Sequence, residues 1–521
     1  MKRKMKLLQT KESVYDLIKI ICAFLFPLVV CLLHCWRLGG GLWEVYLPNS
    51  QNNDDLFYFK QVQGVIEYGF PQGFFGFNES HASSLSFAAW SPLTLLVWVI
   101  WGKVFGWSIS GYYWCNIVFL AVSLAFFVNQ ARPKVKQMVA AGVLLLLFPG
   151  LSKYTLSCLV EAHMISYLIL YYGMALGYVR EQKIWKIVGM LMLSFFLTCI
   201  RPYMVLFVIL PGIFLFARKK WVGIVSTVGV SGLSVISYFL ITKNYTAPYF
   251  TPLFDDYMFK RFAYEGFYAG ARYLVLEALK WMKELGEYMV ASFTTGKFMG
   301  SNYCVLFLIC IVMVVMVFLY RKKMAGLTGI IYIHFVCSAL ISVGALLVIM
   351  GKMNEGSRHI LAFIVVGCIL VSYMQSLKNI WQPFVVSALI LFLFYYYPDD
   401  GQDYQIPLRT EERYEEQLAW EQIAGKVELI PQAPSYENTV IWAFSDIIDG
   451  EYGHIDWQPM LALPEGVGIS CCDLDYITYE FEELKSRYIM TASNGKIAGK
   501  CEEAQYEMLG SYDGIVLYCR K

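Results

Sequence analysis

The chain is poor in charge for its length. Only 16% of its 521 residues are Asp, Glu, Lys or Arg, whereas globular domains usually carry about 25%. The formal net charge is only +2, and no basic block is long enough to predict a nucleic-acid partner. The 14 cysteines are mostly single, lie in apolar stretches and form no CxxC pair. They therefore predict small buried side chains and no zinc site.

Hydrophobic residues dominate instead. They make up 58% of the chain, aromatic residues make up 17%, and the mean hydropathy is +0.51. These values predict a polytopic α-helical membrane protein. The first apolar span, at 17–36, has no small-residue cleavage site and follows a basic N-terminus (Lys2, Arg3, Lys4, Lys6 and Lys11). We therefore expect a retained first helix with a cytoplasmic N-terminus.

Basic clusters set the expected topology, because Lys and Arg favour the cytoplasmic side of a cell membrane. The clusters lie at 132–136, 180–186, 218–220 and 321–323, with a weaker one at Lys378. Placing all of them inside predicts about 11 spans, with the run 187–217 forming a short ascent and descent that turns at Arg201 and Pro202. The other spans are expected at 17–36, 111–130, 138–150, 161–179, 222–242, 303–320, 325–349, 359–376 and 380–397.

This topology divides the chain into two domains. Residues 1–397 form the transmembrane domain, with long outer loops at 37–110 and 243–302. An odd number of spans places the polar tail, 398–521, outside, and its turn-rich, strand-like pieces predict a small α+β domain. The segment 91–106 holds only about 12 strongly apolar positions, fewer than the roughly 20 that an upright span needs. We expect it to lie in the interface, since a full crossing would move the cluster at 132–136 outside.

One stretch of the first outer loop, at 48–68, predicts a short helix that begins with two carboxylates, Asp54 and Asp55. Apolar residues recur along it at helical spacing and give it one greasy side: Leu56, Phe59, Val62, Val65 and Ile66. Such a helix lies on a membrane surface. The two acids indicate either a site for chemistry on a lipid-linked substrate or a simple helix cap.

Further ionisable residues stand at the expected outer ends of the spans. Glu161 and His163 open one span, Arg201 marks the turn, and Arg358 with His359 opens another. Each alone is explained by a snorkelling or ion-paired side chain, but together they gather on one side of the membrane. Arginine suits a phosphate or diphosphate. A carboxylate serves as a general base or binds a divalent cation.

Several short motifs resemble the GT-C class of glycosyltransferases, in particular the protein O-mannosyltransferase and aminoarabinose transferase branch. Asp54-Asp55-Leu-Phe-Tyr is similar to that family's Asp-Glu-x-x-Tyr. The other similar segments are Gly69-Phe-Pro71, Ser91-Pro92-Leu93 and Val104-Phe-Gly106. The layout of spans and outer loops is also similar. The chain departs from the family where Asp55 replaces Glu, Ser-Pro replaces Pro-Pro, and His359 replaces a tyrosine.

The resemblance implies an integral membrane enzyme that transfers a hexosyl or pentosyl group from a polyprenyl-phosphate carrier to a glycan, lipid or protein acceptor, with inversion, on the extracytoplasmic side. It implies Asp54 as the base, with Asp55 and Glu161 as further catalytic acids. Arg201, Arg358, His359 and His163 would bind the phosphate. A divalent cation held by Asp54 and Glu161 stays open. Two other functions also stay open: a flippase or transporter of lipid-linked sugars, and a polysaccharide polymerase or ligase.

Overall fold

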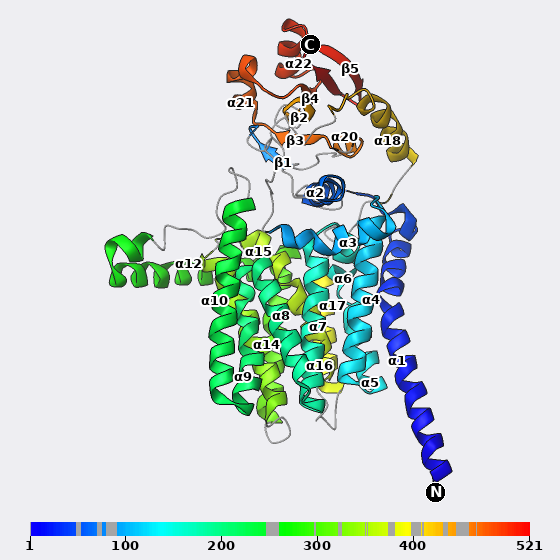
Figure 1. The fold of residues 1–521 in the computed structure, drawn as a ribbon, viewed down its shortest axis with the longest axis vertical. Helices are drawn as coiled ribbons and strands as arrows, with labels where there is room; N and C mark the ends of the chain where they lie inside the picture. The colour runs from blue at the N-terminus through cyan, green and yellow to red at the C-terminus, as the bar shows by residue number, and fades with distance from the viewer. Residues whose placement is uncertain are drawn as a thin grey trace.

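The structure is a computed structural model in which a bundle of long helices carries a small sheet-containing domain at one end (Figure 1). It describes residues 2–47, 54–69, 75–79, 91–245, 260–295, 298–320, 326–349, 353–373, 381–396, 411–430, 436–443, 458–464 and 466–521, together with 351 and 408. Helices predominate, so the α-helical class with a small α+β tail is confirmed.

Seven described helices are long and apolar enough to cross a membrane, which makes the chain a multi-pass membrane protein. They are Val14–Arg37 in α1 (Lys2–Arg37), α4 (Gly111–Ala131), α7 (Val160–Glu181), α10 (Lys220–Tyr245), α13 (Phe298–Leu319), α14 (Leu327–Gly344, continued by η5, Ala345–Ile349) and Gly356–Tyr373, which joins the end of α15 (Met353–His359) to α16 (Leu361–Tyr373). A bent pair, α5 (Val135–Leu146) and α6 (Pro149–Thr155), adds an eighth candidate.

The remaining apolar helices are shorter. They are α3 (Leu96–Phe105, preceded by η2, Pro92–Leu95), α8 (Ile184–Ile200), α9 (Ile209–Arg218, preceded by η3, Pro202–Val208) and α17 (Trp381–Tyr395). About 11 spans would require α8, α9 and α17 to cross as well, so that count stays a prediction. Helix α3 lies across the end of the bundle next to the tail domain (Figure 1). Its place in the interface also stays a prediction.

The break between α8 and η3 lies where the sequence indicates a turn. Proline has no N–H and disfavours a helical conformation in the residue before it. Accordingly α8 ends at Ile200, and Arg201 is extended, with φ −135° and ψ 112°. The chain then resumes at Pro202 as η3. An arginine is thereby held at a gap between two helical segments.

The tail forms a six-stranded sheet in the order β1-β3-β2-β4-β6-β5. Five strands come from the tail. The first four strands in this order, β1, β3, β2 and β4, run parallel to one another. The strands are β1 (Phe75–Phe77), β2 (Thr439–Trp442), β3 (Gly468–Cys471), β4 (Tyr488–Ala492), β5 (Glu507–Tyr512) and β6 (Ile515–Cys519). The edge strand β1 belongs to the first outer loop and pairs with β3 of the tail. The sequence did not indicate this pairing.

Further helices complete the tail and the loops next to it. Those of the tail are α18 (Glu411–Ala424), η7 (Tyr436–Asn438), α20 (Gln458–Leu461), α21 (Leu474–Tyr479), η8 (Phe481–Glu483) and α22 (Lys496–Glu503). Those of the outer loops are η1 (Leu42–Glu44), α2 (Asp54–Tyr68), η4 (Arg261–Glu265), α12 (Phe267–Thr295) and α15 (Met353–His359). Figure 1 shows α12 projecting sideways from the bundle, near the end that carries the tail domain.

Helix α2 lies between the bundle and the tail domain (Figure 1). The expectation of a surface helix with one greasy side was wrong, because most of its side chains are buried, including those of Lys60 and Gln61. Leu56 and Phe57 belong to the core of the tail domain, whereas Phe59 belongs to the core of the bundle. The apolar spacing of α2 placed Leu56 and Phe59 on one greasy side, whereas the structure buries them in different cores.

A buried amide fixes the end of the bundle next to the tail domain. The Asn116 side chain on α4 accepts a hydrogen bond from Trp98 Nε1 on α3 at 2.8 Å. It donates to the carbonyl oxygens of Thr155 and Ser157 at 3.1 and 2.8 Å. These bonds join α3, α4 and the end of α6. A buried polar network satisfied in this way specifies one arrangement of its elements.

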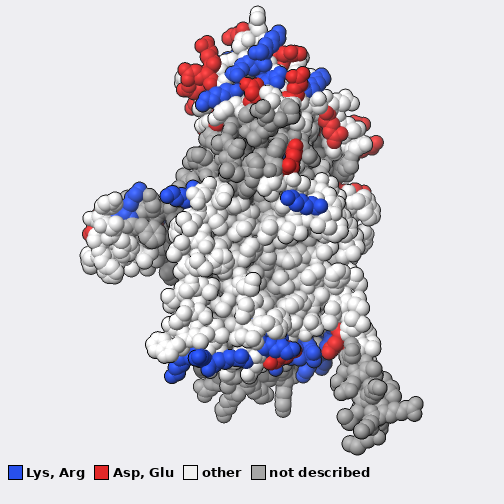
Figure 2. Space-filling model, viewed as in Figure 1, with Lys and Arg blue, Asp and Glu red and all other residues white. Residues whose placement is uncertain are grey.

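Basic side chains form a band at the end of the bundle opposite the tail domain (Figure 2). The described members of the predicted clusters are Arg132, Lys134, Lys136, Arg180, Lys183, Lys186, Arg218, Lys219 and Lys220. The cluster at 321–323 and Lys378 lie outside the described residues. The gathering agrees with the rule that orients membrane proteins. The cytoplasmic placement of this end stays a prediction.

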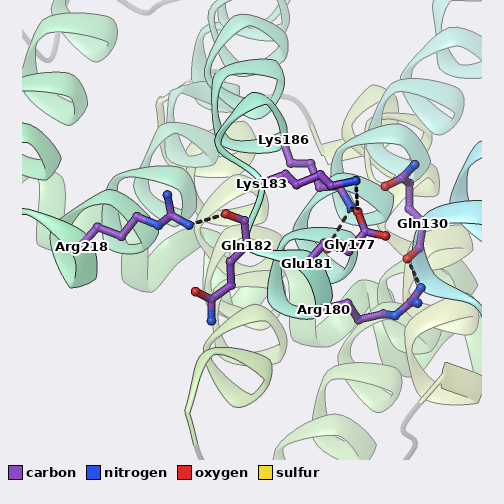
Figure 3. Close-up of polar contacts among 8 residues, drawn as sticks. All are labelled: Gln130, Gly177, Arg180, Glu181, Gln182, Lys183, Lys186 and Arg218. Carbon is purple, nitrogen blue, oxygen red and sulfur yellow. Dashed lines mark hydrogen bonds and ion pairs between the residues drawn. The ribbon is translucent and has the colours of Figure 1, made fainter.

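Within this band, one lysine has a structural role (Figure 3). Lys186 is fully buried and donates from Nζ to the Gly177 carbonyl oxygen at 2.9 Å and to Glu181 Oε2 at 3.1 Å. Lys183 pairs with the same carboxylate at 3.1 Å but is 59% exposed. The buried lysine therefore fastens the start of α8 to the end of α7.

Replacing Lys186 by methionine should destabilise the protein by about 1–3 kcal/mol, because the change removes a buried donor and keeps the apolar stem. Replacing the exposed Lys183 should cost less than about 1 kcal/mol. Thermal unfolding in detergent, followed with a dye that reacts with newly exposed thiols, compares the two variants. Equal loss in Lys186→Met and Lys183→Met would contradict the role given to burial.

Candidate active site

Four charged side chains meet where the bundle faces the tail domain, and they come from four separate elements. Asp54 begins α2, Glu161 lies in the first turn of α7, Arg201 lies at the break before η3, and Arg358 lies in α15. All four were predicted from the sequence as site residues. The structure arranges them as two ion pairs.

The first pair is deeply buried. Arg201 Nη2 lies 2.5 Å from Glu161 Oε1, and the two side chains are 3% and 4% exposed. Glu161 stands near the N-terminus of α7, where the helix dipole stabilises a negative charge. A charge at this depth is expensive unless it is paired. Each of these residues therefore depends on the other.

The second pair is more open to solvent. Arg358 Nη1 lies 2.6 Å from Asp54 Oδ2, and the side chains are 15% and 30% exposed. Asp54 is in the first turn of α2, so a helix dipole again favours its charge. The two pairs are neighbours, because Arg358 also interacts electrostatically with Glu161.

Two tyrosines complete this cluster. The Tyr203 hydroxyl lies 3.4 Å from Arg201 Nη1 and 3.3 Å from His359 Nδ1, which connects the predicted His359 to the pairs. Tyr58, on α2, interacts electrostatically with all four paired residues. Burial, and next the Asp54 carboxylate, raises the pKa of Tyr58, so its hydroxyl keeps its proton.

The structure does not bring the remaining two predicted residues into this cluster. The His163 ring packs against Trp98, with ring centroids 4.2 Å apart, and also contacts Phe119 and Tyr167. Asp55 is fully buried and interacts electrostatically with Tyr112 and Cys158. Their roles in phosphate binding and catalysis stay predictions.

The predicted carboxylates do not form a cation site by themselves. Within the described part of the chain, no group of three or more His, Cys, Asp or Glu side chains is placed to hold a metal ion. Asp54 and Glu161 are each paired with an arginine, which competes with a cation for the same oxygens. Protein sites for hard divalent cations use more oxygen ligands than two such carboxylates supply.

Tyr203 and Tyr58 are members of the cluster that were not assigned a role from the sequence. Both had a signal. Tyr203 follows Arg201 and Pro202 at the expected turn, and Tyr58 stands four residues after Asp54, one helical turn along the same face.

No protein-family model matches the chain, and no curated protein matches it. Solved structures match most of the chain at low sequence identity. An Archaeoglobus fulgidus oligosaccharyltransferase in the apo form matches with a TM-score of 0.49 and 12% identity, over 92% of this chain and 69% of that one. Archaeoglobus fulgidus AglB, in complex with an inhibitory peptide and a dolichol-phosphate, matches with a TM-score of 0.48 and 11% identity, over 98% and 74%.

ArnT from Cupriavidus metallidurans bound to undecaprenyl phosphate matches with a TM-score of 0.42 and 10% identity, over 96% of this chain and 98% of that one. These TM-scores lie below 0.5, so the geometry of the site, and not the likeness, carries the functional argument.

Replacing Glu161 by glutamine should lower the free energy of unfolding by about 3–5 kcal/mol, because the buried charge of Arg201 would lose its carboxylate. Removing both charges together, in Glu161→Gln with Arg201→Met, should recover much of that loss. Apparent melting temperatures in detergent measure both variants. A double variant less stable than Glu161→Gln would show that the pair contributes more than mutual neutralisation.

Proposed function

We propose that this chain is a membrane glycosyltransferase that moves a sugar from a polyprenyl-phosphate carrier to an acceptor, by inverting displacement on the extracytoplasmic side. The observation that carries the proposal is the Asp54–Arg358 ion pair, at 2.6 Å and partly open, beside the buried Glu161–Arg201 pair. One carboxylate and one guanidinium are thereby held together at the outer end of the bundle. Proton transfer and phosphate binding need these two groups.

Arg358 is suited to bind the phosphate of the carrier. Its guanidinium forms charge-assisted hydrogen bonds in a planar fork, which fits two oxygens of a phosphate. In the structure the fork is engaged by Asp54. A phosphate that takes over Arg358 releases the Asp54 carboxylate from its cation, and the released carboxylate is the stronger base.

Asp54 then accepts the proton of the acceptor hydroxyl. The acceptor oxygen forms a bond to the anomeric carbon as the bond between that carbon and the phosphate oxygen breaks, and the electron pair leaves with the polyprenyl phosphate. A carboxylate is a weak base, so correct positioning of donor and acceptor supplies much of the acceleration. Arg358, and Arg201 behind it, stabilise the charge of the leaving phosphate.

Glu161 and His359 support the arginines. Glu161 neutralises Arg201 and keeps it in place. His359 is linked to the same guanidinium through Tyr203 and donates a hydrogen bond to a bound phosphate when its tautomer allows. The distribution of charge disfavours a transporter, whose ion and substrate sites lie near the middle of the membrane.

Replacing Asp54 by asparagine should reduce sugar transfer by about 10²–10⁴-fold, because the amide cannot accept the proton. The matched control is Glu67→Gln, an exposed acid further along the same helix, which should leave transfer unchanged. The assay uses membranes containing each variant and a panel of polyprenyl-phosphate sugars, with several acceptors. Full transfer by a folded Asp54→Asn protein would rule out Asp54 as the base.

Replacing Arg358 by glutamine should raise the KM for the donor by about 10- to 100-fold, because each charge-assisted bond to phosphate contributes roughly 1.5–3 kcal/mol. Arg358→Lys should fall between this variant and the wild type, since lysine keeps the charge and loses the fork. Arg272→Gln, an exposed arginine on α12, serves as the control. A rise confined to the KM for the acceptor would place the phosphate elsewhere.

A further inference from the structure

The first outer loop is fastened to the tail domain by its own strand and by a buried carboxylate. Strand β1 adds to the edge of the sheet as a parallel neighbour of β3, with Phe75 opposite Ile469 and Phe77 opposite Cys471. The loop continues past the strand: Asn78 N donates to the Cys471 carbonyl oxygen at 3.0 Å. Asp473 N in turn donates to Asn78 Oδ1 at 3.1 Å.

Glu79 is the centre of this attachment. It is 4% exposed, and its Oε1 accepts hydrogen bonds from the backbone N–H groups of Lys485 and Ser486, at 3.0 and 2.7 Å, and from the Ser486 hydroxyl at 2.6 Å. Its Oε2 accepts from the Tyr476 hydroxyl at 3.3 Å. Burial, and next the Glu79 charge, raises the pKa of Tyr476, which therefore remains a donor. A buried carboxylate with this many donors is fully satisfied.

The backbone at this point is bent to reach these donors. Asn78 and Glu79 have φ values of 48° and 58°, in the left-handed region that residues other than glycine rarely adopt. Such strain persists only where the surrounding contacts over-determine the conformation. The contacts of Glu79 hold the backbone in this conformation. Besides its side-chain contacts, its backbone N–H donates to Ser470 Oγ at 2.9 Å, and its carbonyl oxygen accepts from the Tyr436 hydroxyl at 3.0 Å.

The tail also holds α2 directly. Lys60 is 3% exposed, and its Nζ donates to the Leu463 carbonyl oxygen at 2.8 Å and to that of Leu461 at 3.5 Å. Leu56 and Phe57 lie in the core of the tail domain. Asp54 is in the first turn of this helix, so the contacts of Lys60 and of the apolar pair fix its distance from Arg358.

We infer that Glu79 and Lys60 are positioning residues, through which the tail domain holds α2 so that Asp54 stays against Arg358. The inference rests on the proposed function of Asp54. The physical reason is that α2 is a separate outer helix, attached through its neighbours to the tail on one side and to the bundle on the other. Loosening the tail attachment changes where the carboxylate lies without removing it, and a small misplacement in a catalytic site has a large effect on rate.

The first test measures the attachment itself. Hydrogen–deuterium exchange is measured on the full-length protein without a sugar donor. The α2 amides, residues 54–68, should exchange roughly tenfold faster or more in Glu79→Gln than in the wild type. The glutamine amide would place an N–H group against the N–H and O–H groups that Glu79 accepts from. The matched control is Glu482→Gln, an exposed acid of the tail, which should leave α2 protection unchanged. Unchanged protection of α2 in Glu79→Gln would overturn the inference.

The second test uses Lys60, in case Glu79→Gln loosens the whole tail. Lys60→Met removes the donor and keeps the stem, whereas Lys60→Arg keeps a donor. Lys60→Met should exchange faster in α2 and lower kcat by about 10- to 100-fold, with the KM for the donor within about twofold of wild type, and Lys60→Arg should recover both readouts in large part. A Lys60→Met protein with faster α2 exchange and wild-type kcat would overturn the positioning role.

The two readouts separate this inference from the proposed function. If Asp54→Asn is fully active, Asp54 is not the base, and α2 exchange still reports whether Glu79 and Lys60 hold the helix. If Asp54→Asn is inactive while Glu79→Gln and Lys60→Met keep both α2 protection and kcat, the proposed function stands and the inference fails.

Discussion

The burial of charge where the bundle meets the tail domain is the constraint on which the candidate site depends. An unpaired charge at this depth is expensive, and removing one member of a buried pair typically costs about 3–5 kcal/mol. Glu161 and Arg201 satisfy each other at 2.5 Å, and Asp54 and Arg358 do so at 2.6 Å. The four residues come from four elements. The start of α7, the break before η3, α15 and α2 are therefore held in one relative arrangement by electrostatics as well as by packing.

Helix α2 connects this arrangement to the rest of the molecule, because it contributes to two hydrophobic cores. Leu56 and Phe57 lie in the core of the tail domain, and Phe59 and Val62 lie in the core of the bundle. A helix shared in this way cannot move with one domain and away from the other without exposing apolar surface, at about 25 cal/mol for each Å². The tail domain is thus part of the scaffold of the site.

Much of the bundle could be predicted from the sequence because its signals are local. Long apolar runs mark the spans, and Pro202 marks the break that leaves Arg201 extended. The attachment of the outer loop to the tail has no local signal. Glu79 and Ser486 are separated by 407 positions, and β1 is only three residues long. A single glutamate in a polar loop looks like a solvated residue until its donors are known, so neither its burial nor the second buried face of α2 could be derived from sequence spacing.

Most of the residues predicted for the site gather in one cluster, but their partners could not be predicted. Helix geometry explains which of the predicted residues lie apart from the cluster. Successive residues of an α-helix are about 100° apart, so Glu161 and His163 point about 200° apart around α7. Glu161 meets Arg201, whereas His163 meets Trp98. Adjacent acids separate in the same way: Asp54 meets Arg358, and Asp55 is fully buried and interacts electrostatically with Tyr112. Residues four apart share a face, which is why Tyr58 lies among the charges with Asp54. The positions of these residues along the chain therefore predicted where the cluster lies. Their angular positions around each helix determine which of them belong to it.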